Sequence, residues 1–165
     1  MVLKYIGVIA LAASAVLSGF YFSNSLNKRV AMLSAMLLFI EDVSVQIRYK
    51  QADIFWVLKH AVSMTFSKDL PFKNKLCEID EELNEASVNQ ILYESGVTED
   101  DQKLICEFFC GLGKSDILGQ LSHCEMYAKL LSEQVKIAKF EADDKGRLYR
   151  ALSLFGSAAV VILLI

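Results

Sequence analysis

Residues 2–22 have the sequence VLKYIGVIALAASAVLSGFYF, in which Lys4 is the one charged side chain. An α-helix rises about 1.5 Å per residue, so a run of this length spans roughly 31 Å, close to the thickness of the hydrocarbon core of a bilayer. Lys4 lies near the start of the run, where its ammonium group can reach the polar interface. The sequence therefore predicts a transmembrane helix over residues 2–22.

The other end of the chain is also apolar. Residues 151–165 carry no charge, and the run extends back to Leu148, with Tyr149 and Arg150 suited to the membrane interface. A helix over 148–165 is about 27 Å long, and mild thinning of the bilayer would complete the crossing. We therefore expect a second transmembrane helix over residues 148–165.

The middle of the chain, residues 23–147, has ordinary charge density and is long enough for one domain with its own core. The whole chain is 54% hydrophobic with a net charge of -3, and its apolar excess lies at the two ends. Between Asp69 and Glu107 there are eleven acidic residues against three lysines. Such a surface repels nucleic acid and could meet a basic protein partner, although a solvated helical face has the same composition.

The pattern of the middle domain is helical. It has one proline, Pro71, and no Asn-Gly or Asp-Gly hairpin signal, and its apolar residues recur at steps of three and four. The expected N-caps of the later helices are Ser87, Thr98 and Ser115. The first four helices are expected over residues 26–49, 52–67, 74–84 and 87–95. The fifth is expected to begin at Thr98 and to be ended by Gly111 and Gly113. The sixth is expected to run from Ser115 towards Arg150. We expect an all-α, membrane-anchored six-helix bundle between two transmembrane helices, with the sixth helix continuing into the second span.

Basic residues are unevenly distributed around the two predicted spans. On the side of the middle domain they are Lys28, Arg29, Lys136, Lys139, Lys145, Arg147 and Arg150, whereas Lys4 lies on the other side. By the positive-inside rule the middle domain faces the cytoplasm. Its four cysteines, Cys77, Cys106, Cys110 and Cys124, would stay reduced there.

No enzyme chemistry follows from the sequence, and we expect no catalytic, cofactor-binding or metal site. Gly113-Lys114-Ser115 resembles the end of a phosphate-binding loop, but Phe108 stands where that motif needs a glycine. Cys106 and Cys110 share a helix face, but their spacing is not that of a zinc finger, and core thiols are favoured. Neither histidine stands in a recognisable catalytic arrangement.

One stretch has a specific resemblance. Gly111-Leu112-Gly113-Lys114-Ser115-Asp116, followed by Gln120, resembles the glycine-rich motif of the stage III sporulation protein AB family. Nearly the whole chain is similar to that family, including the N-terminal span and segments like 41–49, 145–149 and 154–165. The chain departs from the family at 51–53, Gln-Ala-Asp, where members often have a proline.

The resemblance implies a non-enzymatic platform or assembly subunit of a sporulation channel complex between mother cell and forespore. Family members resemble the cytoplasmic helical domains of the inner-membrane platform protein of type II secretion and type IV pilus systems. The implied location is the mother-cell membrane of a spore-forming bacterium. The implied partners are a cytoplasmic secretion-type ATPase and other channel subunits, with no nucleic acid, small-molecule substrate or cofactor.

The candidate partner contacts are the residues of the glycine-rich motif, namely Gly111, Gly113, Ser115, Asp116 and Gln120. The same residues can form a tight corner between two helices, with Asp116 and Gln120 one turn apart on one face, and the two roles are compatible.

Two other functions stay open at this point. Cleavage of a signal peptide near Ala13-Ser14-Ala15 would leave an extracytoplasmic interaction domain anchored by residues 148–165, although the apolar run continues to Phe22. The other alternative is a metal-dependent or nucleotide-dependent membrane enzyme.

Overall fold

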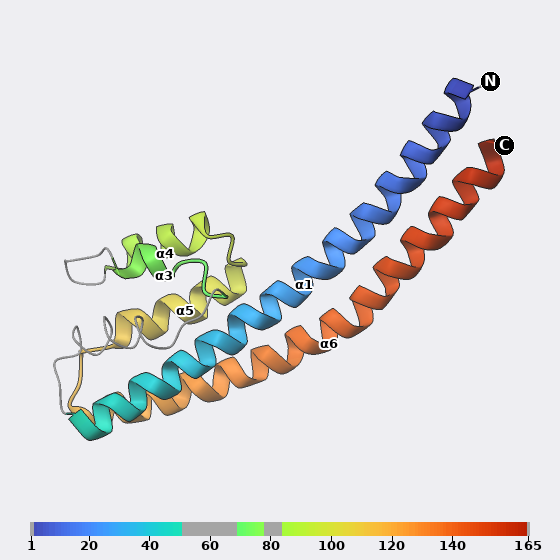
Figure 1. The fold of residues 1–165 in the computed structure, drawn as a ribbon. Helices are drawn as coiled ribbons and strands as arrows, with labels where there is room; N and C mark the ends of the chain where they lie inside the picture. Colours follow the sequence, from blue (N-terminus) through green and yellow to red (C-terminus); the bar gives the residue numbers. More distant parts are fainter. Residues whose placement is uncertain (1, 51–68, 78–83, 165) are drawn as a thin grey trace. The chain divides into compact units, whose positions relative to one another are not determined.

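The computed structural model describes residues 2–50, 69–77 and 84–164, and these residues are helical with short connections (Figure 1). Within the helices, the side chains of residues 2–6, 8–12, 15, 50, 73, 77 and 160–164 are not described. The helices are α1 (Val2–Lys50), α3 (Lys73–Cys77), α4 (Glu85–Glu94), α5 (Glu99–Gly111) and α6 (Ile117–Leu164). The predicted all-α class is confirmed for this part of the chain.

The chain divides into two compact units. The paired-helix unit consists of residues 1–30 and 136–165, which are the first part of α1 and the last part of α6. The bundle unit consists of residues 31–135, which include the rest of α1 and α6 together with α3, α4 and α5.

The expected six-helix bundle is not confirmed, because the described residues contain five helices. A separate helix starting near Leu26 was the wrong expectation, since α1 runs without a break from Val2 to Lys50. Ser23, Asn24 and Ser25 each cost a helix at most about 0.7 kcal/mol relative to alanine, so they do not end it. The helix expected over 52–67 lies outside the described residues.

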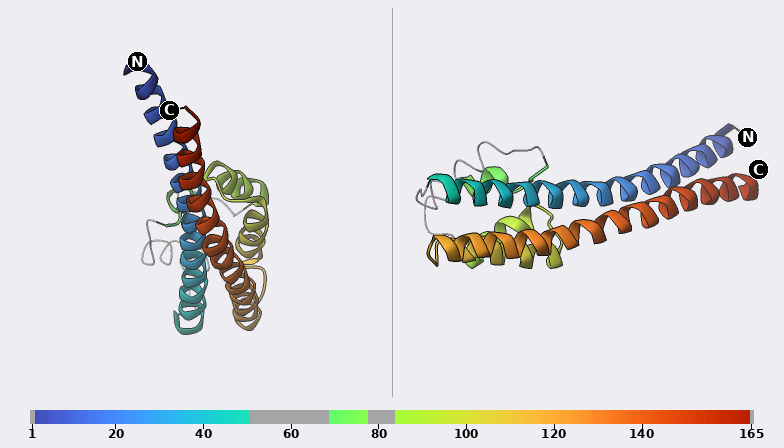
Figure 2. Two further views of the ribbon diagram at one scale, coloured as in Figure 1. Left: turned by 90° about the vertical axis from the view of Figure 1, so that its right-hand side faces the viewer. Right: turned by 90° about the horizontal axis from the view of Figure 1, so that it is seen from below.

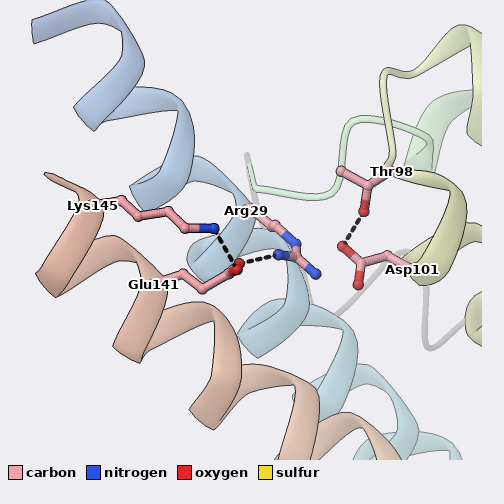
Figure 3. A network of polar contacts seen from close by, with 5 residues as sticks. All are labelled: Arg29, Thr98, Asp101, Glu141 and Lys145. Atoms are coloured by element: carbon pink, nitrogen blue, oxygen red, sulfur yellow. Dashed lines mark hydrogen bonds and ion pairs between the residues drawn. The ribbon is translucent and has the colours of Figure 1, made fainter. Parts of the chain in front are cut away.

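The helix ends show which polar residues act as caps. Asn84 caps α4 by accepting a 2.9 Å hydrogen bond from the Ala86 amide, so the prediction of Ser87 is wrong by one turn. Thr98 precedes α5 as predicted, and its hydroxyl donates a 2.6 Å hydrogen bond to Asp101 (Figure 3). Gly96, with φ of 74°, follows α4 as expected for a residue that stops a helix.

The bundle unit has a conventional apolar core built around four buried phenylalanines. The Phe108 and Phe109 rings of α5 lie 5.4 Å apart, and the ring of Phe39 from α1 lies 5.7 Å from Phe109. Phe72, just before α3, lies 6.5 Å from Phe109. Other fully buried side chains are Leu33, Met36, Ile40, Val43, Leu92, Ile105 and Leu131. Burial of each such side chain stabilises the fold by about 1.5–3 kcal/mol.

The paired-helix unit has the reverse arrangement, with small residues between its helices. A Cβ atom on Gly19 of α1 would lie 2.5 Å from the Ser153 hydroxyl and 2.9 Å from the Tyr149 carbonyl oxygen of α6. A Cβ on Gly146 would lie 3.2 Å from the Ser23 hydroxyl, and Ser23 is itself buried. The helix backbones therefore approach closely, and the helices lie side by side in the views of Figures 1 and 2.

Large apolar side chains cover the outside of the paired-helix unit. The exposed ones are Leu17, Phe20, Tyr21, Phe22, Ile137, Phe140, Leu148, Tyr149, Leu152, Leu154 and Phe155. Small residues inside and large apolar residues outside are typical of helices that pack within a bilayer. By length and composition, the described residues contain one candidate membrane-crossing segment, Val16–Tyr49 of α1. Its part beyond Val30 contributes buried side chains to the bundle core, whereas its part within the paired-helix unit carries the exposed Leu17, Phe20, Tyr21 and Phe22.

A polar network joins the two helices of the paired-helix unit near its boundary. Arg29 of α1 donates a 2.8 Å hydrogen bond to Glu141 of α6, and Lys145 donates one of 2.7 Å to the same carboxylate (Figure 3). The hydrogen bond from Lys145, followed by the positive charges of Lys145 and Arg29, lowers the pKa of Glu141. This network links the two helices at Arg29 and Glu141.

Candidate functional site

The predicted motif forms the connection between α5 and α6, residues 111–116, which we call the glycine corner. Gly111 is the last residue of α5, and a Cβ atom there would overlap the ring of His123. Gly113 has φ of 82°, a left-handed conformation that side-chain-bearing residues rarely adopt. Leu112 between them is buried. Each glycine is therefore required by local geometry.

Asp116 provides the cap of α6. Its carboxylate accepts a 3.0 Å hydrogen bond from the Gly119 amide, and its carbonyl accepts one of 2.8 Å from the Gln120 amide. The prediction that Ser115 caps this helix is therefore wrong, because the aspartate one position later lies at the point where the helix begins. A carboxylate here also interacts favourably with the positive end of the helix dipole.

Gln120 lies inside the corner. Its side chain is 2% exposed, and its amide nitrogen donates a 3.0 Å hydrogen bond to the Ser115 hydroxyl. Its amide oxygen has no partner among the described residues. Gly113, Ser115 and Asp116 are exposed. Within the motif, Gln120 is thus buried and stabilises the corner by its hydrogen bond, whereas Gly113, Ser115 and Asp116 form a surface that a partner could reach.

A groove beside the corner, of about 630 Å³, was not foreseen from the sequence. Helices α4, α5 and α6 form its walls, and the glycine corner contributes Gly111 and Lys114. Its charged lining consists of the carboxylates Glu85, Glu99 and Glu107 and the amines Lys103 and Lys114. We call it the acidic groove. The excess of acidic residues between Asp69 and Glu107 was the sequence signal that pointed towards it.

Two thiols near this groove, those of Cys106 and Cys124, have raised pKa values. Burial, followed by the hydrogen bond with Cys110, raises the pKa of Cys106 to about 12, and their sulfur atoms lie 3.8 Å apart. Burial raises the pKa of Cys124 to about 11. Since the thiolate is the reactive form, these thiols are poor nucleophiles.

His123 also has a packing role. Its ring stacks on Phe108 at 5.6 Å, and its Nε2 lies 3.0 Å from the Phe108 carbonyl oxygen. In the part of the chain that the structure describes, no three histidine, cysteine, aspartate or glutamate side chains gather where they could hold a metal ion. The histidine thus holds the end of α5 against α6, at the place that Gly111 leaves open.

The comparison with protein families covers both units and the glycine corner. Residues 4–165 match the family model described as Stage III sporulation protein AB. The chain belongs to the stage III sporulation protein AB family. No curated protein and no solved structure shows a significant match.

Membership of the stage III sporulation protein AB family gives the chain a role in sporulation, and this is not a known enzyme family. The match includes both α1 and α6, so the stage III sporulation protein AB sequence extends over the helices of the paired-helix unit as well as over the bundle unit.

Proposed function

We propose that this chain is a non-enzymatic platform subunit of a sporulation channel complex, which docks a secretion-type ATPase at the mother-cell membrane. The observation that carries the proposal is the opposite character of the two units. The paired-helix unit has small residues between its helices and large apolar side chains outside, whereas the bundle unit has an apolar core and a groove with charged lining. Such a chain can be held by the first unit and bind a partner through the second.

In this proposal, residues 2–22 and 148–165 cross the membrane, and the bundle unit lies in the cytoplasm. Two features support this placement. Small residues line the contact between the helices of the paired-helix unit, as in membrane helix pairs. The basic residues Arg29, Lys145 and Arg147 follow or precede the proposed spans on the bundle side, which favours a cytoplasmic location.

The glycine corner and the acidic groove form the proposed docking surface. Lys114 and Asp116 are exposed at the corner, next to the groove carboxylates of Glu85, Glu99 and Glu107. A partner with basic side chains would complement these carboxylates, and charge complementarity mainly increases the rate and the specificity of association. The proposed similarity to platform proteins of type II secretion and type IV pilus systems makes an ATPase the expected partner.

Helix α6 offers a route for transmitting work from the ATPase. It begins directly after the glycine corner and continues as one helix to Leu164. A displacement imposed at its start would therefore be carried by a continuous hydrogen-bonded rod towards the proposed second span.

The docking surface is tested by measuring the affinity of the purified full chain for the ATPase of the same complex. Lys114→Glu and Asp116→Asn change surface charge, and asparagine caps a helix as well as aspartate does. We expect Asp116→Asn to weaken binding about tenfold, the effect of one lost charged contact of roughly 1.4 kcal/mol, and to lower the number of heat-resistant spores. Lys114→Glu adds a carboxylate that faces the basic partner, so it should strengthen binding.

The matched control is Lys129→Glu, which makes the same charge reversal at an exposed position of α6 outside the acidic groove. It should bind the ATPase as the natural chain does. Equal binding by all three variants and the natural chain would overturn the proposed docking surface. Gln120→Ala is unsuitable for this test, because it removes the hydrogen bond that stabilises the corner.

A further inference from the structure

A second cavity, of about 430 Å³, lies within the paired-helix unit. Its lining combines the aromatic side chains of Phe20 and Tyr21 with Ser23, Asn24 and Asn27 from α1 and with Arg150 from α6. No acidic side chain lines it among the described residues. The cavity therefore combines one cation, neutral hydrogen-bonding groups and apolar surface.

Arg150 is held in place by its own helix. Its Nε donates a 3.0 Å hydrogen bond to the Gly146 carbonyl oxygen. A Cβ atom on Gly146 would lie 3.2 Å from the Ser23 hydroxyl and 3.9 Å from Nη2 of Arg150, so the glycine leaves room for the guanidinium beside α1. Its Nη groups donate no hydrogen bond within the described part of the chain. The guanidinium has five N–H donors, and most of them are therefore available to a ligand.

We infer that this cavity binds the phosphate of an anionic phospholipid headgroup, with Arg150 as the cation and Asn24 and Asn27 as amide donors. This inference rests on the membrane placement in the proposed function. Ser23, Asn24 and Asn27 directly follow the proposed first span, and Arg150 lies at the start of the second. Basic pockets between membrane helices on the cytoplasmic side are where anionic headgroups bind.

The neighbouring aromatic side chains support the same depth in the membrane. Tyr21 and Phe22 are exposed, and the rings of Phe22 and Tyr149 lie 5.7 Å apart. Tyrosine is enriched at the level of the headgroups, where its ring is apolar and its hydroxyl is solvated. The acyl chains of the bound lipid would then contact the exposed apolar surface of Leu17 and Phe20.

Arg147 provides a matched control for Arg150. Both are exposed arginines of α6, three positions apart, but Arg147 does not line the cavity. An arginine binds a phosphate through two parallel hydrogen bonds, whereas a lysine binds it as a point charge. A specific site therefore distinguishes Arg150→Gln from Arg147→Gln, and natural Arg150 from Arg150→Lys.

The experiment titrates the full chain in neutral detergent micelles with phosphatidylglycerol or phosphatidylcholine, and counts bound lipid by native mass spectrometry. We expect saturable binding of phosphatidylglycerol, an affinity about tenfold lower for Arg150→Gln, and little change for Arg147→Gln. Arg150→Lys should lose most of the affinity. An equal loss in the two glutamine variants would overturn the site and leave only general attraction at the interface.

Additional measurements distinguish a lipid phosphate from free inorganic phosphate, and the lipid site from the docking surface. Inorganic phosphate should not compete at the lipid concentrations used, and full competition would overturn the assignment to a lipid. Circular dichroism of Arg150→Gln should match that of the natural chain, and Arg150→Lys tests the site with the charge kept. Arg150→Gln should still bind the ATPase, and Lys114→Glu should still bind the lipid. A failure of the docking proposal can therefore be distinguished from a failure of the lipid site.

Discussion

The bundle unit encloses a core of large apolar side chains, whereas the paired-helix unit has small residues between its helices and large apolar side chains on its outside. Phe109 in the bundle unit is 1% exposed, whereas Phe155 in the paired-helix unit is 75% exposed, and Gly19 lies inside that unit. Exclusion of water drives the packing of the bundle core, but it offers nothing between helices surrounded by lipid, where close contact of small residues takes over. In the proposed membrane placement, helices α1 and α6 therefore pack by close contact of small residues in one unit and by burial of apolar side chains in the other.

The largest expected difference in the free energy of unfolding is between two variants that each remove a phenylalanine ring, one in each unit. Phe109→Ala should cost about 3–5 kcal/mol in the free energy of unfolding, because it leaves a cavity in the aromatic core. Phe155→Ala should cost less than about 0.5 kcal/mol, the value for an exposed position. Chemical denaturation of the full chain in detergent micelles measures both changes. Similar losses in the two variants would contradict the reversed arrangement.

The next effect comes from enlarging a glycine. Gly19→Leu should destabilise the helix pair by about 1–3 kcal/mol, because its side chain would collide with Ser153 and the Tyr149 carbonyl. Gly156→Leu is the matched control, since a Cβ atom there meets no described atom within 4 Å. The same denaturation experiment compares the two. The close helix contact would be wrong if Gly19→Leu were as stable as the control.

Within the bundle unit, Gly113→Ala should cost about 1–2 kcal/mol, the penalty for placing a Cβ atom in a left-handed conformation. Lys114→Ala, one position later and exposed, should change stability by less than about 0.5 kcal/mol. Thermal unfolding followed by circular dichroism gives both values. If Gly113→Ala left the stability unchanged, the glycine corner would have to have another conformation.

The smallest effect is a dependence on pH in the paired-helix unit. Because the pKa of Glu141 is lowered in the folded chain, its contribution to stability is complete above its ordinary value of 4.5 and is lost as the pH falls through the folded pKa. Glu141→Gln should remove this part of the acid dependence, about 1 kcal/mol or less for so accessible a network. Unfolding curves between pH 3 and 7 test this, and identical acid profiles would exclude a role for the network.

Much of the architecture could be predicted from the sequence because it depends on local patterns. Apolar periodicity predicted Ile105, Phe108 and Phe109 as a buried face, and Gly96 was correctly expected to end a helix. The continuity of α1 through Ser23–Ser25 could not be predicted in this way. Three weak helix formers suggest a boundary in the sequence, but their propensity costs are too small to end the helix, and Ser23 is buried close to Gly146 of α6.

The glycine corner was predictable in its position but not in its detail. The glycines and Asp116 identified a corner, since such residues are typical of helix ends. Which residue caps α6 depends on a shift of one position, and the burial of Gln120 depends on packing that local patterns do not contain. The acidic excess between Asp69 and Glu107 indicated a charged surface, but the groove itself brings together Glu85 and Glu107 from different helices, and local sequence patterns do not predict that arrangement.

The most direct test of the opposite surroundings of the two units is the accessibility of spin labels in the chain reconstituted in liposomes. Labels replace Phe155 in the paired-helix unit and the exposed Ser122 in the bundle unit, after the native cysteines have been changed to alanine and the fold verified. We predict that the label at 155 collides with oxygen but not with a water-soluble nickel complex, and that the label at 122 does the reverse. Free access of the nickel complex to position 155 would contradict the membrane placement of the paired-helix unit.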